Sequence, residues 1–235
     1  MGVEEVNRFK TLATNLGIEI DAARSEAALA EDNEHAAGGQ IVVGGELVSV
    51  PAEEQVARVG EVGLPIMLQD APLSGVELTI PLLTKMACEI EMLKLLKIES
   101  VGTAAKLAAL LAAAGDHIDG PFDGEEGITL LADLEAGATG TMTSATIPDQ
   151  IKPVVTSFLA GETDAATAAY ARVLPAINHE NRQCGFRAAK EAMVEGRVIK
   201  SAFCRHPIPR LSDAARAQLM AFLHPLDPVV LSWGK

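Results

Sequence analysis

Aromatic residues are scarce in this chain: phenylalanine, tryptophan and tyrosine together make up 3% of its 235 residues, although apolar residues as a whole make up 49%. The core must therefore be built from aliphatic side chains. The sequence contains no uninterrupted run of about 18 apolar residues, and its start, MGVEEVNRFK, lacks the apolar stretch of a signal peptide. We expect a cytoplasmic protein with no membrane partner.

Positive charge is also in short supply, because the formal net charge is −13. This argues against a nucleic-acid partner, which would be held by clustered lysine and arginine. Cys88, Cys184 and Cys204 form no C-x-x-C pair, so they are expected to be reduced thiols. The five histidines never form a metal-binding pattern, and no strand is followed by a dinucleotide or P-loop motif. We therefore expect no metal and no cofactor.

Two regimes follow one another along the sequence. Up to about Ser144, short apolar runs alternate with helical spacings, and after about Pro148 every segment has helical character. The predicted strands are Gln40 to Val43, Pro65 to Leu68, Leu93 to Ile98, His117 to Gly120 and Ala138 to Met142. This alternation predicts an α/β fold with a parallel sheet, and we favour a barrel. We expect a partial barrel domain at 1–150 and a helical subdomain at 151–235.

Helices are predicted on both sides of that division. Within the α/β part, apolar residues at helical spacing lie near residues 83–90 and 107–114, with Gly115 as a C-terminal cap. The later helices are expected from Ile151, at 164–174, at 178–195 and at 212–223, with Asp164 and Ser212 as N-caps. The N-terminal segment is predicted to contain a helix over 6–16, a short strand in GIEID and a helix over 22–34.

One strand carries a pair of residues suited to chemistry. In LLKIES, Lys97 and Glu99 are two positions apart, so in a strand they point to the same side. An amine that has lost its proton can form an imine with a keto carbon, and a neighbouring carboxylate can move protons. At the C-terminal end of a barrel strand such a pair would stand where active sites form. From the spacing alone, an ordinary ion pair at a strand end is the more common interpretation.

Several motifs in order resemble the dihydrodipicolinate synthase family. PIMLQDAPLSGVEL, LKLLKIES and GPFDGEEGITLLADLEAGATGTMTSATIPD are similar to the fifth to eighth β/α units of its (β/α)8 barrel, and the tail resembles its C-terminal helical domain. GGQIVVGG resembles the fourth strand. The resemblance implies that Lys97 forms the imine. It also implies that Gly120 and Met142 line the part of the site that holds the pyruvate-like end of the substrate.

Within the family, IMLQDAPLSG, ENRQCG and DPVVLSWGK are most similar to dehydratases that act on L-2-keto-3-deoxyarabonate. This implies a Schiff-base hydro-lyase that makes 2-oxoglutarate semialdehyde. Gln69 replaces the family's proton-relaying tyrosine, which leaves Glu99 as the acid–base group. Gln69 and Asp70 could orient a substrate hydroxyl. Asp123, Glu125 and Glu126 are interpreted as the start of the next helix.

The resemblance begins after the family's second strand, so we expect an N-terminally truncated barrel without the loop that holds the substrate carboxylate. The exposed sheet edges of such a barrel would cost stability or recruit a partner. Dimers or tetramers of this chain are expected by resemblance. Two alternative functions stay open: dihydrodipicolinate synthase or another pyruvate-dependent aldolase, and a catalytically impaired binder of 2-keto acids.

Overall fold

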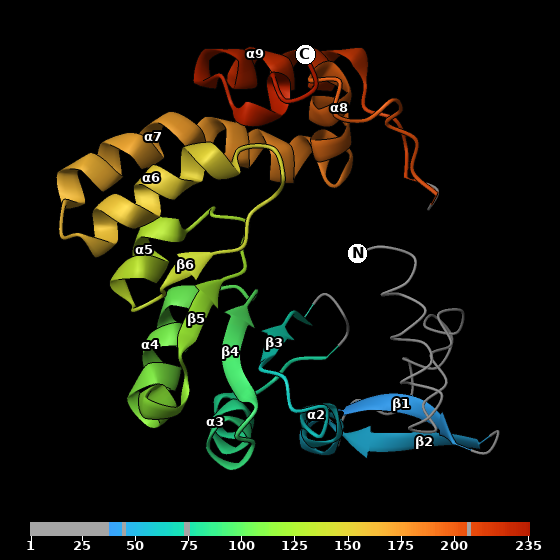
Figure 1. The fold of residues 1–235 in the computed structure, drawn as a ribbon, viewed down its shortest axis with the longest axis vertical. Coiled ribbons are helices and arrows are strands. Elements are labelled where there is room, and N and C mark those ends of the chain that lie inside the picture. Colours follow the sequence, from blue (N-terminus) through green and yellow to red (C-terminus); the bar gives the residue numbers. More distant parts are fainter. Residues whose placement is uncertain (1–37, 44–45, 73–75, 206–207) are drawn as a thin grey trace.

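A computed structural model of the chain describes residues 38–43, 46–72, 76–205 and 208–235 (Figure 1). The elements predicted between residues 6 and 34 lie outside the described residues. No helix in the described part is both long and apolar enough to cross a membrane.

Four parallel strands form the central sheet, in the order β3-β4-β5-β6. Helices alternate with them along the chain, as expected, and Figure 1 shows β4 and β5 side by side with α4 beside them. The strands are β3 (Ile66–Asp70), β4 (Leu93–Ile98), β5 (Gly120–Asp123) and β6 (Gly140–Thr141), and the connecting helices are α3 (Ile80–Glu89), α4 (Thr103–Ala114) and α5 (Leu130–Glu135).

The two faces of this sheet differ in polarity. Leu96 and Ile98 of β4 are fully buried in one core with apolar residues of α3 and α4, such as Leu83 and Leu107. Because successive side chains of a strand point to opposite faces, Lys97 points the other way. The register places Gln69 of β3 beside it. The face that carries these polar residues is the one on which a site can form.

The strand predicted over Gln40 to Val43 exists, but its predicted place in the parallel sheet was wrong. It is β1 (Gly38–Val43), which pairs with β2 (Glu46–Pro51) as a separate antiparallel sheet, and α2 (Ala52–Gly60) follows. Two glycines stand between β1 and β2 in the sequence, a composition typical of two-residue hairpins. That local signal outweighs the resemblance to a barrel strand.

The strand predicted over His117 to Gly120 was displaced. His117 ends a short 3₁₀ helix, η2 (Gly115–His117), and the strand begins at Gly120. The prediction covered HIDG and ended at Gly120, before Pro121, because glycine and proline usually mark the end of a strand. It therefore left out Asp123, and buried carboxylates are rare. Asp123 is nevertheless fully buried in β5 because backbone amides and a hydroxyl bind its side chain.

The second half of the chain is helical, as expected. Its elements are α6 (Pro148–Leu159), α7 (Thr163–His179), the π-helical turn η3 (Glu180–Cys184), α8 (Arg187–Glu195), α9 (Asp213–Leu223) and the short helices η4 (His224–Leu226) and η5 (Val229–Leu231).

One detail of these helices was predicted correctly, and two were not. Ser212 is confirmed as an N-cap, because its hydroxyl accepts a hydrogen bond from the Ala215 amide at 3.1 Å. Asp164 is no cap, since α7 begins one residue earlier. The helix predicted over 178–195 is broken at Gly185, whose φ of 57° lies outside the helical region. The division into two domains near residue 150 stays a prediction.

Candidate active site

Lys97 and Glu99 lie together at the end of β4. The Lys97 ammonium is 3.0 Å from Glu99 Oε2, and the two side chains are 12% and 23% exposed. Gln69 Nε2 donates a hydrogen bond of 2.5 Å to the same oxygen. The structure thus brings together three of the predicted site residues, around one carboxylate oxygen.

The other three predicted residues lie apart from this cluster. Asp70 is fully buried, forms an ion pair of 2.7 Å with Lys106 and accepts a hydrogen bond from the Leu78 amide. Gly120 is buried at the start of β5, where an added Cβ would stand 2.9 Å from the Leu95 side chain. Met142 is 42% exposed. The Asp70 backbone carbonyl accepts a hydrogen bond of 2.8 Å from the Glu99 amide, but the Asp70 side chain points to Lys106 and not to the Lys97 cluster.

A cavity of about 550 Å³ adjoins the cluster. Glu99 lines it, and Lys97 lies behind that carboxylate. The other walls are the loop after β5, the 143–145 segment, and the turn η3 with the residues that follow it. Parts far apart in the sequence therefore enclose one space beside the amine. In the described part of the chain, no group of three His, Cys, Asp or Glu side chains could hold a metal ion.

The loop after β5 is pressed against the end of β4. Gly124 donates its amide to the Ile98 carbonyl at 2.8 Å, and a Cβ at this position would lie 2.9 Å from the Cβ of Glu99. Only glycine permits this approach. Asp123 then accepts hydrogen bonds from the amides of Glu125 (2.7 Å) and Gly127 (3.1 Å). The sequence DGEEG therefore forms a tight loop that faces Glu99.

Glu126 is the functional candidate that sequence reasoning missed. We predicted that Asp123, Glu125 and Glu126 open a helix, and this was wrong, because α5 begins only at Leu130. Glu126 lines the cavity. Its backbone φ is 58°, a conformation that residues other than glycine rarely adopt. The signal available in the sequence was a carboxylate between two glycines directly after a strand.

The surroundings hold the Glu126 backbone in this conformation. Thr143 Oγ1 donates to the Glu126 carbonyl at 3.2 Å. Tyr170, from α7, donates its hydroxyl to the Gly127 carbonyl at 3.0 Å and also to the Ile128 carbonyl. Strained backbone persists only where its neighbours fix it, and such sites cluster at functional positions. The loop is fixed from both halves of the chain.

The cavity favours protonated carboxyl groups. Burial raises the pKa of Glu126, and the nearby carboxylate of Glu180 raises it further, although Lys97 opposes the shift. Glu180, in η3, is 7% exposed and accepts a hydrogen bond of 3.0 Å from Thr146 Oγ1. Burial raises its pKa as well. The site therefore offers an amine, a carboxylate paired with it, and a second carboxyl group, Glu126, whose pKa lies above its ordinary value.

The chain is similar to a known dehydratase. L-2-keto-3-deoxyarabonate dehydratase from Azospirillum brasilense is 52% identical over 182 residues, which cover 77% of this chain and 59% of that enzyme. The chain thus spans about three-fifths of the length of this relative.

Solved structures show the same fold. Dihydrodipicolinate synthase from Rhodopseudomonas palustris matches with a TM-score of 0.65 and 25% identity, over 74% of this chain and 62% of that one. The enzyme from Aquifex aeolicus matches with a TM-score of 0.67 and 18% identity, over 76% and 62%. The sheet with its helices is therefore part of a (β/α)8 barrel. The model of the dihydrodipicolinate synthetase family matches residues 54–226, and the chain belongs to that family.

Proposed function

We propose that this chain carries the active site of a Schiff-base hydro-lyase that dehydrates a 2-keto-3-deoxy sugar acid. The observation that carries the proposal is the cluster of Lys97, Glu99 and Gln69 beside a cavity that also contains Glu126. The similarity to the Azospirillum brasilense dehydratase supports L-2-keto-3-deoxyarabonate as the substrate and 2-oxoglutarate semialdehyde as the product.

The first step joins the Lys97 amine to C2 of the substrate. The amine attacks the keto carbon after losing its proton, the keto oxygen leaves as water, and an imine forms. Glu99 Oε2, at 3.0 Å from the amine, is placed to take up the proton and to return it to the departing keto oxygen, which leaves Glu99 as a carboxylate. The protonated imine then withdraws electrons from C3, so that a C3 proton becomes acidic.

Two carboxyl groups divide the elimination. Glu99 acts as the base that removes the C3 proton. The electron pair of the broken C3–H bond then forms the C3–C4 double bond as the C4 hydroxyl leaves. Glu126 acts as the acid that protonates this hydroxyl, so that it departs as water. The raised pKa of Glu126 suits the acid. Water then hydrolyses the imine, and proton shifts from C5 to C3 and from the C5 hydroxyl to C4 give the aldehyde.

Gln69 distinguishes this reaction from that of a pyruvate-dependent aldolase. Its amide cannot titrate as a phenol does. It holds Glu99 by a hydrogen bond instead, and this leaves acid–base work to the carboxyl groups. The remaining alternative is a binder of 2-keto acids that forms no imine.

Trapping with borohydride tests the proposal. We expect incubation with L-2-keto-3-deoxyarabonate or pyruvate to add the mass of the reduced keto acid to the protein. Lys97→Ala should abolish the adduct, and Lys94→Ala, which changes another lysine of β4, should retain it. The dehydration product should form only with the protein that can be trapped. An unmodified protein at ~1 mM keto acid, the upper end of ordinary KM values, would refute the lyase and leave the binder.

A further inference from the structure

The cavity beside Lys97 is lined by acidic side chains, although its proposed substrate is itself an acid. The glutamates that line it are Glu99, Glu125, Glu126 and Glu180. A 2-keto acid brings a carboxylate of its own, and like charges repel one another strongly where the surroundings exclude water. Lys97 supplies a cation, but Glu99 already pairs with it. The bound acid therefore needs a further positive group.

Arg182 provides such a group. Of the described residues that line the cavity, it alone carries a positive side chain. Arg182 is exposed, and its guanidinium has no ion-pair or hydrogen-bond partner among the residues that the structure describes. A guanidinium has five N–H donors and no acceptor. These donors are free to meet a ligand that enters the cavity.

The other side chains of the cavity wall that could donate are engaged within the protein. The Thr143 hydroxyl donates to a loop carbonyl at 3.2 Å, and the Ser144 hydroxyl donates to Thr146 at 2.8 Å. The Asn181 amide donates to the Ile177 carbonyl of α7 at 2.9 Å. The main side-chain donor left for a ligand is therefore the free guanidinium.

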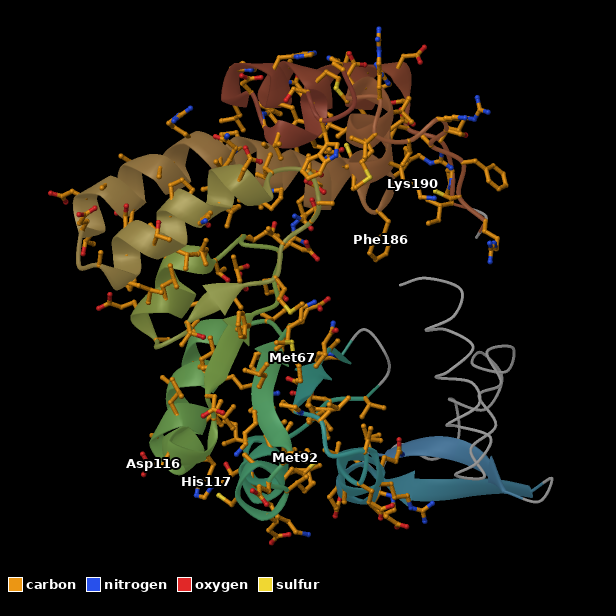
Figure 2. The ribbon with its side chains drawn as sticks, viewed as in Figure 1. Met67, Met92, Asp116, His117, Phe186 and Lys190 are labelled. Carbon is orange, nitrogen blue, oxygen red and sulfur yellow. The ribbon has the colours of Figure 1, made fainter. Side chains whose placement is uncertain are left out.

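The turn η3 presents this guanidinium to the cavity. Glu180, Asn181 and Arg182 follow one another in the chain, and all three line it. The turn is π-helical, and the Gly185 amide closes it by donating to the Glu180 carbonyl at 2.8 Å. Such turns are frequent at functional sites. Figure 2 shows Phe186, which also lines the cavity, projecting from the helical part toward the sheet.

A guanidinium and a carboxylate match in shape as well as in charge. Arginine presents its donors in a planar fork that can bind both oxygens of a carboxylate. A 2-keto-3-deoxy sugar acid carries one anionic group, the C1 carboxylate, and its hydroxyl and keto groups are neutral. We propose that Arg182 binds this carboxylate and so selects 2-keto acids over neutral ketones. The inference rests on the proposed function, because C1 adjoins the C2 atom that Lys97 attacks.

Borohydride trapping of the full chain at a series of ligand concentrations tests the inference. Pyruvate carries the carboxylate, and pyruvamide is its neutral counterpart. We expect Arg182→Gln to raise the pyruvate concentration for half-maximal trapping by about tenfold or more, the effect of losing a hydrogen bond to a charged group. The value for pyruvamide should stay unchanged. Arg182→Lys, which retains the charge but not the fork, should give an intermediate value for pyruvate.

Arg172→Gln is the matched control. It removes the same charge from an exposed position of α7 that does not line the cavity, so the values for both ligands should stay as they are in the unmodified chain. Circular dichroism should show that every variant is folded. Equilibrium dialysis with labelled pyruvate repeats the comparison without imine chemistry, and Arg182→Gln should weaken this binding as well.

The outcomes separate this inference from the proposed function. If Arg182→Gln traps and binds pyruvate as the unmodified chain does, the inference is overturned and the lyase stands. The same holds if the variant loses pyruvamide equally, or if Arg172→Gln weakens pyruvate to the same extent. Binding that depends on Arg182 without an adduct at Lys97 would support the inference and refute the lyase. A chain that binds no pyruvate overturns both.

Discussion

Glu99 Oε2 receives both the Lys97 ammonium and the Gln69 amide, so one oxygen connects the imine-forming amine to the acid–base group. Replacing this carboxylate should separate imine formation from elimination. We expect Glu99→Gln to lower kcat for dehydration by about 10²- to 10⁴-fold, the usual contribution of a general base. A borohydride adduct at Lys97 should still form on longer incubation.

Mass spectrometry of the trapped protein and a kinetic assay measure the two effects separately. Glu91→Gln, an exposed position before β4, serves as the matched control and should behave as the unmodified chain does. Equal loss of trapping and turnover would mean that Glu99 acts only by holding Lys97 in place.

Glu126 shows that the site is maintained at a cost in stability. A side chain in the left-handed region costs about 1–2 kcal/mol, and asparagine tolerates that region better. We expect Glu126→Asn to raise the melting temperature by a few degrees, as about 0.5–1 kcal/mol of stabilisation would, while dehydration falls at least about 100-fold. Calorimetry and kinetics measure the two quantities.

Arg197 provides the matched comparison, because it is exposed and also has a left-handed φ, of 60°. Arg197→Asn should raise the melting temperature similarly and leave kcat unchanged. If Glu126→Asn keeps its activity, the strain belongs to the loop and the carboxyl group has no part in the reaction.

At the scale of elements, the sequence predicted what local periodicity determines. The bounds of β4 were predicted correctly, since an apolar run between charged ends leaves little choice. The N-cap Ser212 was predicted because its bond is local. The helix start predicted at Asp164 was one residue late, and element bounds are the least certain part of such predictions.

What failed depends on contacts distant in sequence. The position of β5 depends on Asp123, which is buried because loop amides and Thr141 bind it. No pattern within β5 reveals those partners. The strand period predicted that Lys97 and Glu99 point to the same side, and the resemblance to the family suggested their roles. The position of Glu126, in contrast, follows from how its loop packs on β4.

A buried carboxyl group on α5 gives the fold a pH dependence. Asp133 is fully buried, and burial raises its pKa to about 6, although a hydrogen bond from Thr129 opposes the shift. A carboxyl group whose pKa is higher in the folded chain than its ordinary value of 3.8 stabilises the fold only while it is protonated. Its contribution is complete below pH 3.8 and is lost as the pH rises to about 6.

We therefore expect Asp133→Asn to stabilise the chain above pH 6 by up to about 3 kcal/mol, the equivalent of two pKa units. The decline in stability between pH 4 and 6 should flatten in this variant. Urea unfolding at a series of pH values measures both. An unchanged pH profile would show that Asp133 is not the titrating group.

The whole molecule assembles its site from both parts of the chain. The sheet supplies Lys97 and Glu99, the loop after β5 supplies Glu126, and the turn η3 of the helical part closes the cavity with Glu180. Tyr170 joins these parts, since its hydroxyl reaches from α7 to the loop carbonyls. The helical part is thus coupled to the geometry of the acid group.

Removing that hydroxyl should affect both stability and catalysis. Tyr170→Phe leaves two loop carbonyls without this donor, which should cost about 1–3 kcal/mol. Because the Glu126 backbone then relaxes, kcat should fall while KM changes little. Thr156→Ala is the matched control: it removes another hydroxyl-to-carbonyl hydrogen bond of the helical part, on the exposed side of α6, and should leave kcat unaltered. If Tyr170→Phe lowers the melting temperature but retains full kcat, the helical part supports the fold alone and the loop holds Glu126 without it.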